Sequence, residues 1–459
     1  MQPFHYEITD INIIEAFLAV KHIPYSLLLD SADPKHAASR YSYVMCMPVE
    51  TIKAKNGTIT VTNWDQRLNL TGDPLDIVQE RLSSWISDTQ GLNGLPPFQG
   101  GAAGLFGYDL ARSLEKMPEN EHDKSAVPDL AVGIYDQVLA YDNLRKRSYI
   151  FTHANNEEEA TKKHDYFIKL ITQEIEAPKY EKQTPPLNWS SNFDEQSYCK
   201  AVQKTIDYIY AGDIFQANIS QSFTAPRPKE TFDPFIHYRH MREVNPSPFA
   251  CYMNLGDIKI SSASPERFIT IKDDIIETCP IKGTRPRSDN IVEDKNNKKE
   301  LQTSEKERAE NTMIVDLLRN DLSKICTPDS VEVTKLCELE SFTNVHHLVS
   351  TVRAKLAKNK EPIDVLRACF PGGSITGAPK IRAMEIIDEL EDVDRGAYCG
   401  SIGFIGFNGA MDTNILIRTL MYDENTITLQ AGGGIVADSD PETEYQETLD
   451  KASAIFNSF

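Results

Sequence analysis

The stretch Cys279-Pro280-Ile281-Lys282-Gly283-Thr284-Arg285-Pro286-Arg287 places a lysine between a strand-like run and a glycine turn, with two arginines close behind. A lysine in this setting can act as a nucleophile, anchor a phosphate or carboxylate, or be an ordinary surface lysine. Nucleophilic attack needs a neutral amine, which is scarce near pH 7 unless burial or neighbouring cations favour it. The stretch alone leaves these three roles open.

Two predicted helices flank this stretch on its C-terminal side and carry glutamates beside their apolar stripes. The first covers about residues 304–320 and places Glu310 on that stripe; the second, from residue 440 onward, has Glu444 and Glu447 one turn apart. A carboxylate bordering a buried face is costly unless it is paired or binds a metal. Mg²⁺ takes one or two protein carboxylates plus water and substrate oxygens. The pattern leaves a magnesium site and salt bridges open.

Three glycine-rich segments invite comparison with anion-binding loops. Residues 372–380 have phosphate-loop spacing, but Ala378-Pro379 stands where a phosphate loop needs lysine and then serine or threonine, so a nucleoside triphosphate site is rejected. A glycine turn into a helix remains there, and its start can bind an anion. Residues 431–434 allow backbone N–H groups close to a carboxylate, or form a plain turn. For residues 100–104 we predict mainly packing.

The chain divides into an N-terminal α/β region, residues 1–175, and a second region, residues 192–459. Between them, residues 176–191 are polar and proline-containing, and are the predicted linker. No internal repeat is visible. Strand-like runs alternate with helical patterns, which predicts a mixed α and β fold.

Local signals predict where some elements begin and end. Asn192 and Glu195 have the spacing of a capping box at the start of a helix that ends at Ala211-Gly212. The polar stretch 288–299 is predicted to be a solvated loop.

Composition excludes several classes. The 459 residues include 48 Lys+Arg and 68 Asp+Glu, a net charge of −20, with 40% hydrophobic and 25% charged residues. This usage is globular rather than disordered or fibrous, and the acidic balance argues against nucleic acid or an anionic membrane as partner. An anionic substrate therefore needs a locally positive site.

Cysteine usage and the N-terminus point to a cytoplasmic protein. The eight cysteines are scattered without any C-x-x-C pair, which favours free thiols in a reducing compartment. Residues 1–10 do not have the pattern of a signal peptide, and no apolar run approaches the ~20 residues of a membrane helix.

Six motifs occur in the order found in the chorismate-utilising enzymes, which the sequence resembles from about residue 194 to the C-terminus, and more weakly at residues 98–101 and 107–109. These motifs are Ser264-Pro265-Glu266-Arg267, Pro280-Ile281-Lys282-Gly283-Thr284, Ala309-Glu310-Asn311-x-Met313-Ile314-Val315-Asp316-Leu317, His347-Leu348-Val349-Ser350, Gly377-Ala378-Pro379-Lys380 and Glu444-x-x-Glu447. The resemblance implies an α+β fold like that of anthranilate synthase component I, with two packed β-sheets flanked by helices and a substrate cleft in the C-terminal part.

The resemblance also assigns binding roles. It implies that Glu310 and Glu447 bind Mg²⁺, with Glu444 in or just behind that shell, and that the metal holds the ring carboxylate of chorismate. The implied substrate-binding residues are Gln216, Thr284, Tyr398, Arg418, Gly432, Gly433 and Gly434. Arg418, Tyr398 and the glycine backbone match the residues that hold the pyruvyl carboxylate, and with Mg²⁺ they provide the positive site that an acidic protein needs.

The implied catalytic residues are Glu266, Lys282 and His347. Lys282 attacks ring carbon 2 of chorismate and forms a covalent adduct, while Glu266 acts as general acid for the departing 4-hydroxyl. Ammonia then attacks carbon 4 and expels the lysine. His347 helps position ring substituents near the metal, although a lone histidine is often structural.

Two residues, Lys282 and Gln216, distinguish between the activities found in this family. Anthranilate synthases carry alanine where Lys282 stands, and isochorismate synthases use a lysine where Gln216 stands. The pair predicts a transferase that makes 4-amino-4-deoxychorismate, on the route to para-aminobenzoate and folate. Anthranilate synthesis is the alternative. A non-catalytic tryptophan-binding subunit is disfavoured because Glu266, Lys282 and the metal glutamates are all retained.

The resemblance implies two further ligands. No G-x-C-x-G context for glutamine hydrolysis occurs, so ammonia is expected from a separate glutamine amidotransferase subunit in a heterodimer. A segment around Leu27-Leu28-Leu29-Asp30-Ser31 resembles the lining of a tryptophan pocket, or is an ordinary core strand. The implied tryptophan-binding residues are Ser31, Ser39, Arg40, Tyr41, Pro248, Phe249 and Ala250.

Overall fold

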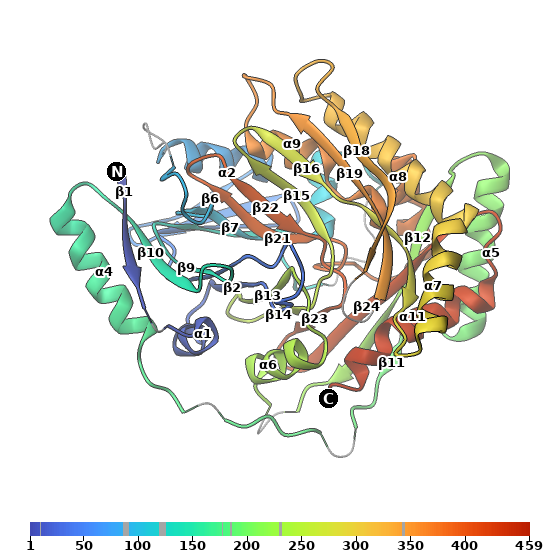
Figure 1. The fold of residues 1–459 in the computed structure, drawn as a ribbon, viewed down its shortest axis with the longest axis horizontal. Helices are drawn as coiled ribbons and strands as arrows, with labels where there is room; N and C mark the ends of the chain where they lie inside the picture. Colours follow the sequence, from blue (N-terminus) through green and yellow to red (C-terminus); the bar gives the residue numbers. More distant parts are fainter. Residues whose placement is uncertain are drawn as a thin grey trace.

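The computed structural model describes residues 1–9, 11–85, 91–118, 125–176, 178–183, 186–228, 232–341 and 345–459. Over these residues the chain forms two large antiparallel β-sheets that pack together, with helices on their outer faces (Figure 1). The predicted α+β class with two packed, helix-flanked sheets is confirmed. Within the same residues, none of the helices has the length and apolar character needed to span a bilayer.

The first sheet includes the long C-terminal strand β24 paired with β12. Its order is β1 (Gln2–Ile8), β10 (Arg147–Ala154), β9 (Gln137–Asp142), β3 (Tyr41–Met45), β2 (Ser26–Asp30), β13 (Ala250–Asn254), β14 (Lys259–Ser262), β23 (Thr419–Tyr422), β24 (Thr426–Ile435), β12 (Gln216–Pro226) and β11 (Ser190–Ser191), with β20 (Gly377–Ala378) paired to β12.

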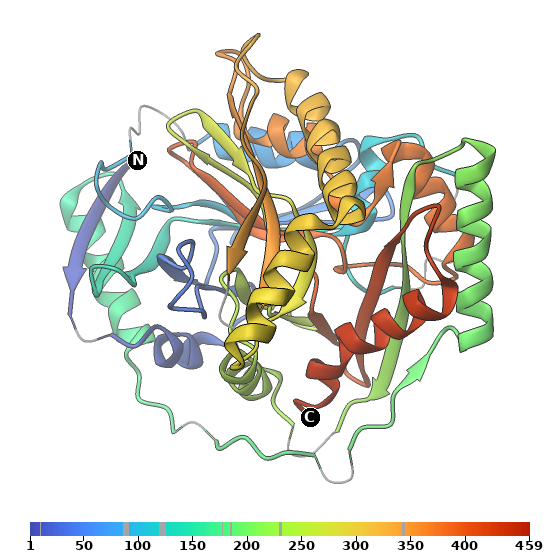
Figure 2. The ribbon, with the colours of Figure 1, turned by 45° about the vertical axis from the view of Figure 1, so that its right-hand side comes forward.

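The second sheet carries the lysine stretch on β17. Its order is β17 (Ile281–Pro286), β19 (Val345–Lys355), β16 (Ile275–Thr278), β15 (Arg267–Lys272), β22 (Met411–Asn414), β21 (Ser401–Gly406), β7 (Gly101–Phe106), β8 (Leu130–Tyr135), β4 (Glu50–Lys55), β5 (Thr58–Asn63) and β6 (Arg67–Leu70), with β18 (Glu332–Ser341) paired to β19. Figure 2 shows the β18–β19 hairpin, in orange, projecting from the body of the molecule.

The helices cover the outer faces of both sheets. They are α1 (Ile13–Val20), α2 (Pro74–Ser83), α3 (Ala111–Leu114), α4 (Glu157–Ile171), α5 (Glu195–Ala211), α6 (Pro234–Val244), α7 (Ile291–Thr303), α8 (Glu305–Ser323), α9 (Pro362–Cys369), α10 (Lys380–Leu390) and α11 (Pro441–Phe456), with 3₁₀ turns η1 (Tyr108–Leu110) and η2 (Gly373–Ile375).

Side chains alternate between two apolar layers along the central strands. On β2, Leu27 packs in the core between the sheets, whereas Leu28 packs in the outer core with α1 and α6. On β7, Ala103 faces the inner core and Ala102 the outer one. Because a strand's period is two, strands buried on both faces have continuous apolar runs.

Both sheets contain strands from both predicted regions. In the first sheet β2 pairs with β13, and in the second β7 pairs with β21. The described residues between α4 and β11 contain no helix or strand and run along the outside of the molecule (Figure 1). Residues 177, 184 and 185 of the predicted linker lie outside the described part, and the division into regions stays a prediction.

The predicted helices around 304–320 and from residue 440 are confirmed as α8 and α11, capped by Ser304 and Asp440. The helix after the linker is confirmed as α5, ending at Gly212 with φ 85°. Its predicted cap is wrong by two residues: Asp194 caps it, in a capping box with Ser197. The side chain of Asn192 instead accepts a hydrogen bond from the Ser222 backbone, which ties the chain to β12.

The predicted loop 288–299 is wrong, because most of it lies in α7. Only Asp294 and Leu301 of this helix are buried, so its sequence has almost no apolar stripe. Asn290 caps its start, and Asp294 fixes it to β19 through a 2.8 Å contact with Nε2 of His346. The helix therefore depends on capping and tertiary contacts that a periodicity search does not detect.

The packing role predicted for the glycine-rich residues 100–104 is confirmed. Gly101 has φ 144° and Gly104 has φ 155°, and a Cβ on either would lie within 2.3 Å of a neighbouring strand's backbone oxygen. Only glycine allows β8 and β21 to approach β7 this closely.

Candidate active site

A cavity of about 470 Å³ lies between the two sheets, bounded by β12 and β24 of the first sheet, β17 and β19 of the second, and helices α8 and α11. The predicted site residues that line it are Glu266, Lys282, Thr284, Glu310, His347, Tyr398, Arg418, Gly432, Gly434, Glu444 and Glu447. The fold thus brings together segments more than 150 residues apart in the sequence, and their individual roles stay predictions.

A β-bulge presents Lys282 to the cavity. The register between β17 and β19 shifts between Lys282 and Thr284, which leaves Gly283 as the extra residue. Gly283 has φ +76°, and a Cβ there would lie 2.8 Å from Leu301 on α7. The positive φ therefore favours glycine, and a larger residue would also force the Leu301 side chain to move. The Nζ of Lys282 donates to the backbone oxygen of Ser374 at 3.2 Å.

Glu266 is a buried carboxyl beside that lysine. Only 6% of the residue is exposed, and burial raises its pKa to about 7, against opposing effects from the Ser374 hydrogen bond and the Lys282 charge. The Ser374 hydroxyl donates to Oε1 at 2.9 Å. A carboxyl with this pKa is partly protonated near neutral pH, which suits a general acid.

His347 is also buried, and it lies against the lysine strand. Its Nδ1 is 2.9 Å from the Thr284 hydroxyl and 3.3 Å from the Gly283 carbonyl. Burial lowers the pKa of His347 to about 4, so the ring is neutral at physiological pH. It can orient Thr284 and the bulge, but it carries no charge to the substrate.

Three carboxylates from α8 and α11 face the cavity. Burial raises the pKa of both Glu310 and Glu444, and the latter accepts a hydrogen bond from the Ser439 hydroxyl at 2.7 Å. Glu447 is paired with Lys451 at 2.7 Å. Glu307 further raises the pKa of Glu310, and Glu447 that of Glu444, so mutual repulsion adds to burial.

This set of oxygens suits a magnesium ion completed by substrate and water. Across the described ranges, no three His, Cys, Asp or Glu side chains already converge as a closed metal cluster. Mg²⁺ does not need one, because it usually keeps several waters and takes one or two carboxylates. A cation beside Glu310 and Glu444 would also relieve the repulsion and burial that raise their pKa values.

Arg418 is a cation without a carboxylate partner in the described structure. It is half-buried, has φ 53°, and burial lowers its pKa. The phenol of the buried Tyr398 lies in the same cavity, hydrogen-bonded to Asn218. A desolvated guanidinium with no internal counterion is a favourable site for a substrate carboxylate.

The glycine run 432–434 lies within strand β24 rather than in a turn. It pairs with β12 on one edge, whereas β23 pairs only as far as Leu429 on the other. Among the described residues, backbone groups on that second edge therefore have no strand partner. The Gly432 carbonyl accepts a hydrogen bond from Lys451 at 2.8 Å. A Cβ at Gly433 would lie 2.9 Å from Glu444, so glycine permits the close approach of the acidic helix.

Gln216 lies directly behind this wall. It is completely buried, and neither its Nε2 nor its Oε1 has a protein partner in the described structure. A Cβ on Gly434 would lie 2.4 Å from Nε2 of Gln216 and 3.5 Å from Nζ of Lys282. The amide therefore adjoins the lysine across Gly434.

The glycine-rich segment 372–380 contributes Ser374 to the site rather than an anion-binding helix start. The helix start at Lys380 does not line the cavity, and its side chain is bonded to Asp321. Instead Ser374, in the 3₁₀ turn η2, contacts both Glu266 and Lys282.

The sequence patterns did not single out Arg395, Asn218 or Ser374, which support or line the wall of the first cavity. Arg395 is 2% exposed, forms an ion pair with Glu391 at 2.7 Å, and donates to the backbone oxygens of Asn218 and Ile375. Asn218 and Ser374 both line the cavity. Ser374 stands in a glycine-rich segment already noted, whereas a buried arginine has no distinguishing sequence pattern.

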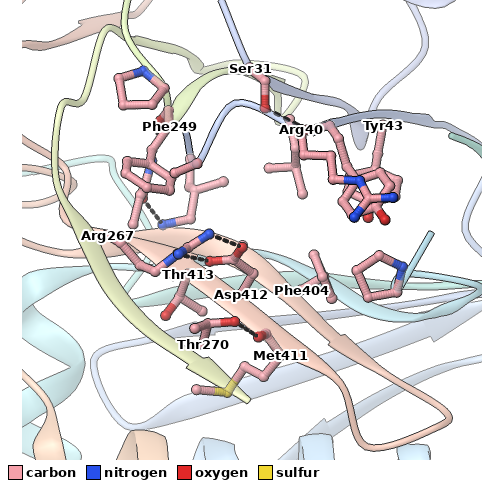
Figure 3. A pocket seen from close by; sticks show the side chains of 18 of the residues that line it. Ser31, Arg40, Tyr43, Phe249, Arg267, Thr270, Phe404, Met411, Asp412 and Thr413 are labelled. Atoms are coloured by element: carbon pink, nitrogen blue, oxygen red, sulfur yellow. Dashed lines mark hydrogen bonds and ion pairs between the residues drawn. The ribbon is translucent and has the colours of Figure 1, made fainter. Parts of the chain in front are cut away.

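A second cavity, of about 280 Å³, is lined by β2 and β3 of the first sheet and by β15, β21 and β22 of the second (Figure 3). Six of the seven predicted tryptophan-binding residues line it, namely Ser31, Arg40, Tyr41, Pro248, Phe249 and Ala250. Ser39 does not line it and is buried, with no protein partner for its hydroxyl in the described structure. Arg267 and Asp412 form an ion pair on the opposite wall.

Comparison with known proteins agrees with this architecture. The family described as chorismate binding enzyme matches residues 25–457. Aminodeoxychorismate synthase component 1 from Escherichia coli (strain K12) is 42% identical over 443 residues, which cover 96% of this chain and 94% of that protein. Anthranilate synthase component 1 from Acetivibrio thermocellus is 38% identical and covers 93% of this chain and 88% of its own.

A solved structure extends the likeness to three dimensions. The crystal structure of anthranilate synthase component I from Streptococcus pneumoniae TIGR4 matches with a TM-score of 0.81 at 34% identity, covering 92% of this chain and 93% of that one. The matching fold and the matching family agree over nearly the whole length. This chain is an enzyme that belongs to the chorismate-binding enzyme family.

Proposed function

We propose that the enzyme converts chorismate and ammonia to 4-amino-4-deoxychorismate through a covalent adduct on Lys282. The observation that supports this most directly is the pairing of an amine and an acid in one cavity: Lys282 and the buried Glu266, whose pKa is about 7, both contact Ser374. A nucleophile and a proton donor at the same substrate are what displacement of a hydroxyl requires.

In the first half-reaction, Nζ of Lys282 forms a bond to ring carbon 2. The ring double bonds shift, the bond from carbon 4 to oxygen breaks, and the oxygen leaves as water with the proton of Glu266. The Glu266 carboxylate then accepts the proton released by the new secondary amine. The acid is thereby regenerated.

In the second half-reaction, ammonia forms a bond to carbon 4 and the double bonds shift back. The bond between carbon 2 and Nζ breaks, and Lys282 leaves with a proton supplied by Glu266. The nitrogen at carbon 4 gives up one proton in exchange. The sum is chorismate plus ammonia giving aminodeoxychorismate plus water.

Substrate charge is matched by the cations of the cavity. Arg418, with Tyr398 and the open edge of Gly432–Gly434, would bind the pyruvyl carboxylate. Glu310 and Glu447, with Glu444 beside them, would hold Mg²⁺, which supplies positive charge for the ring carboxylate. His347 would keep Thr284 in position through its 2.9 Å contact.

A separate subunit would supply ammonia. Several curated relatives carry the name component 1, and no G-x-C-x-G nucleophile context occurs in this sequence. We therefore propose a glutamine amidotransferase partner that delivers ammonia to the cavity. The product would lead to para-aminobenzoate and folate.

The second cavity would hold L-tryptophan. Its aromatic and proline lining, with Ser31 and the Arg267–Asp412 pair, suits an aromatic ring and a zwitterionic head group. A binding measurement with tryptophan tests this without turnover.

Anthranilate synthesis is the second candidate, because relatives of that name are 38% identical. Incubation of the enzyme with chorismate, Mg²⁺ and an ammonium salt, followed by chromatography and mass spectrometry, separates the two. Aminodeoxychorismate is the expected product. Anthranilate, isochorismate or unchanged chorismate would overturn the proposal.

A further inference from the structure

Within the part of the chain that the structure describes, Ser374 is the one residue bonded to both the candidate acid and the candidate nucleophile. Its hydroxyl donates to Oε1 of Glu266 at 2.9 Å, and its backbone oxygen accepts from Nζ of Lys282 at 3.2 Å. Glu266 precedes β15, Lys282 lies on β17 and Ser374 lies in η2, so three separate segments meet at this serine.

The turn that carries Ser374 is held firmly on several sides. Thr376 donates its hydroxyl to the Gly372 carbonyl at 2.9 Å, and Arg395 donates to the Ile375 carbonyl at 3.2 Å. A Cβ at Gly373 would lie 2.4 Å from Leu317 of α8, so η2 is packed directly against the helix that bears Glu310. A serine fixed in this way has a defined direction for its hydroxyl and its carbonyl.

We propose that Ser374 is a positioning residue that selects which oxygen of Glu266 carries the transferable proton and which way the Lys282 amine points. This rests on the proposed function. Because the Ser374 hydroxyl donates to Oε1, the proton of the neutral acid resides on Oε2, which remains for the departing hydroxyl. Because the Ser374 carbonyl accepts one N–H of Lys282, the lone pair of the neutral amine is directed away from η2.

The electrostatics of Glu266 agree with this geometry. Burial is the main cause of its raised pKa, while the Ser374 hydroxyl, the Lys282 charge and the Ile281 backbone N–H oppose it. Burial raises the pKa of the Cys399 thiol, and the Glu266 charge adds to that rise, so this thiol also faces the acid. Loss of the Ser374 donor removes a stabiliser of the charged carboxylate, so Glu266 must hold its proton to higher pH.

The test is a ¹³C NMR titration of the glutamate carboxyls in the intact enzyme, with the Glu266 signal assigned by its loss in Glu266→Gln. Ser374→Ala is expected to raise the titration midpoint of Glu266 by about one pH unit, the scale of one hydrogen bond to a charged group. Ser374→Thr restores a hydroxyl and should return the midpoint most of the way. If Ser374→Ala folds poorly, Ser374→Cys takes its place. Cysteine is nearly isosteric with serine and a weaker donor, so the Glu266 midpoint should again shift upward.

Single-turnover mixing with chorismate then measures the rate of adduct formation. We expect a fall of about tenfold in Ser374→Ala with little change in chorismate affinity. Ser453→Ala is the matched control, since that hydroxyl lies on the exposed side of α11 and its one hydrogen bond to a described residue is to the backbone oxygen of Asp450. An unmoved midpoint, or a moved midpoint with an unchanged adduct rate, would overturn the inference.

The NMR titration needs no turnover, so it remains informative whatever product the enzyme makes. A wild type that makes anthranilate overturns the proposed function and leaves the midpoint shift to be judged by itself. A wild type that makes aminodeoxychorismate while Ser374→Ala keeps the wild-type midpoint overturns only the role of Ser374.

Discussion

Glu266 and Arg267 are consecutive in the chain, yet their side chains lie in different cavities. Glu266 lines the cavity of Lys282, whereas Arg267 lines the second one, where its Nε and Nη2 donate to the two oxygens of Asp412 at 2.9 and 3.0 Å (Figure 3). The register of β15 against β22 shifts directly after Arg267, which marks a bulge at this point. A ligand that contacts Arg267 in the second cavity therefore contacts the residue next in sequence to the candidate acid.

The Arg267–Asp412 pair should be important for stability. Asp412→Asn leaves a largely buried guanidinium without its counterion, and we expect the free energy of unfolding to fall by about 2 kcal/mol. Denaturant unfolding measures this. The matched control is Asp316→Asn, whose exposed partner Arg319 lies at 2.9 Å, with an expected change under about 0.5 kcal/mol. Equal losses in the two variants would contradict the prediction.

Lys282→Ala should abolish the covalent adduct. Intact-protein mass spectrometry of the enzyme quenched with chorismate is expected to show the added mass on the wild type and none on the variant. Lys306→Ala, which removes another lysine from the lining of the same cavity, should keep the adduct. A wild type that never gains mass, or a Lys282→Ala enzyme with the same rate and product, would contradict covalent catalysis.

Part of this site could be predicted from the sequence, and the reason is local. Lys282, Glu310 and Glu447 stand in short motifs whose residue types and spacing are visible without a fold, and the structure places all three on one cavity. The contact of Ser374 with both Glu266 and Lys282 is different. It depends on how η2 packs between two strands and α8, and no spacing within residues 372–380 encodes that.

Helix α7 and the cap of α5 show a second limit. The stretch 288–299 is polar because only two of the helix's residues face the core, so its helical state depends on Asn290 and on the His346–Asp294 contact. At α5, Asn192 and Asp194 are both good cap residues, and the backbone direction after β11 decides between them. Tertiary context overrode local propensity in both places.

The free energy of unfolding should depend on pH through Glu266. Its folded pKa, about 7, is raised above the ordinary 4.5 by burial, so the folded protein binds this proton more tightly than the unfolded chain. That stabilisation is complete below about pH 4.5 and is lost as the pH rises through 7. Glu266→Gln lacks this loss.

Denaturant unfolding at several pH values checks the effect. The variant should exceed the wild type by about 2 kcal/mol more at pH 8 than at pH 5. Glu305→Gln, on the exposed start of α8, is the control and should change stability by less than about 0.5 kcal/mol. A difference between Glu266→Gln and wild type that is constant across pH would refute the argument.

Magnesium should stabilise the folded enzyme through the acidic helices. At saturating Mg²⁺ we expect Tm to rise by about 1–2 °C, since a ligand that binds only the folded state adds stability by mass action. Differential scanning calorimetry with and without Mg²⁺ measures it. Glu310→Gln and Glu447→Gln should lose the rise, whereas Glu424→Gln, in an exposed turn, should keep it. A rise retained in Glu310→Gln would place the ion elsewhere.

Replacing Gln216 should raise the free energy of unfolding and lower turnover. Its amide is completely buried and has no protein partner in the described structure, which is costly for folding, yet it adjoins Lys282 across Gly434. Gln216→Met keeps the volume and removes the polar atoms, so we expect the free energy of unfolding to rise by about 1 kcal/mol while turnover falls at least tenfold. Gln221→Met is the informative comparison, because that buried amide donates to Thr448 and its loss should destabilise the fold. Unfolding curves and product assays on the same variants test both effects. A destabilised Gln216→Met enzyme would mean that the amide is hydrogen-bonded in the folded protein. A stabilised Gln216→Met enzyme with full activity would mean that the amide has no part in the reaction.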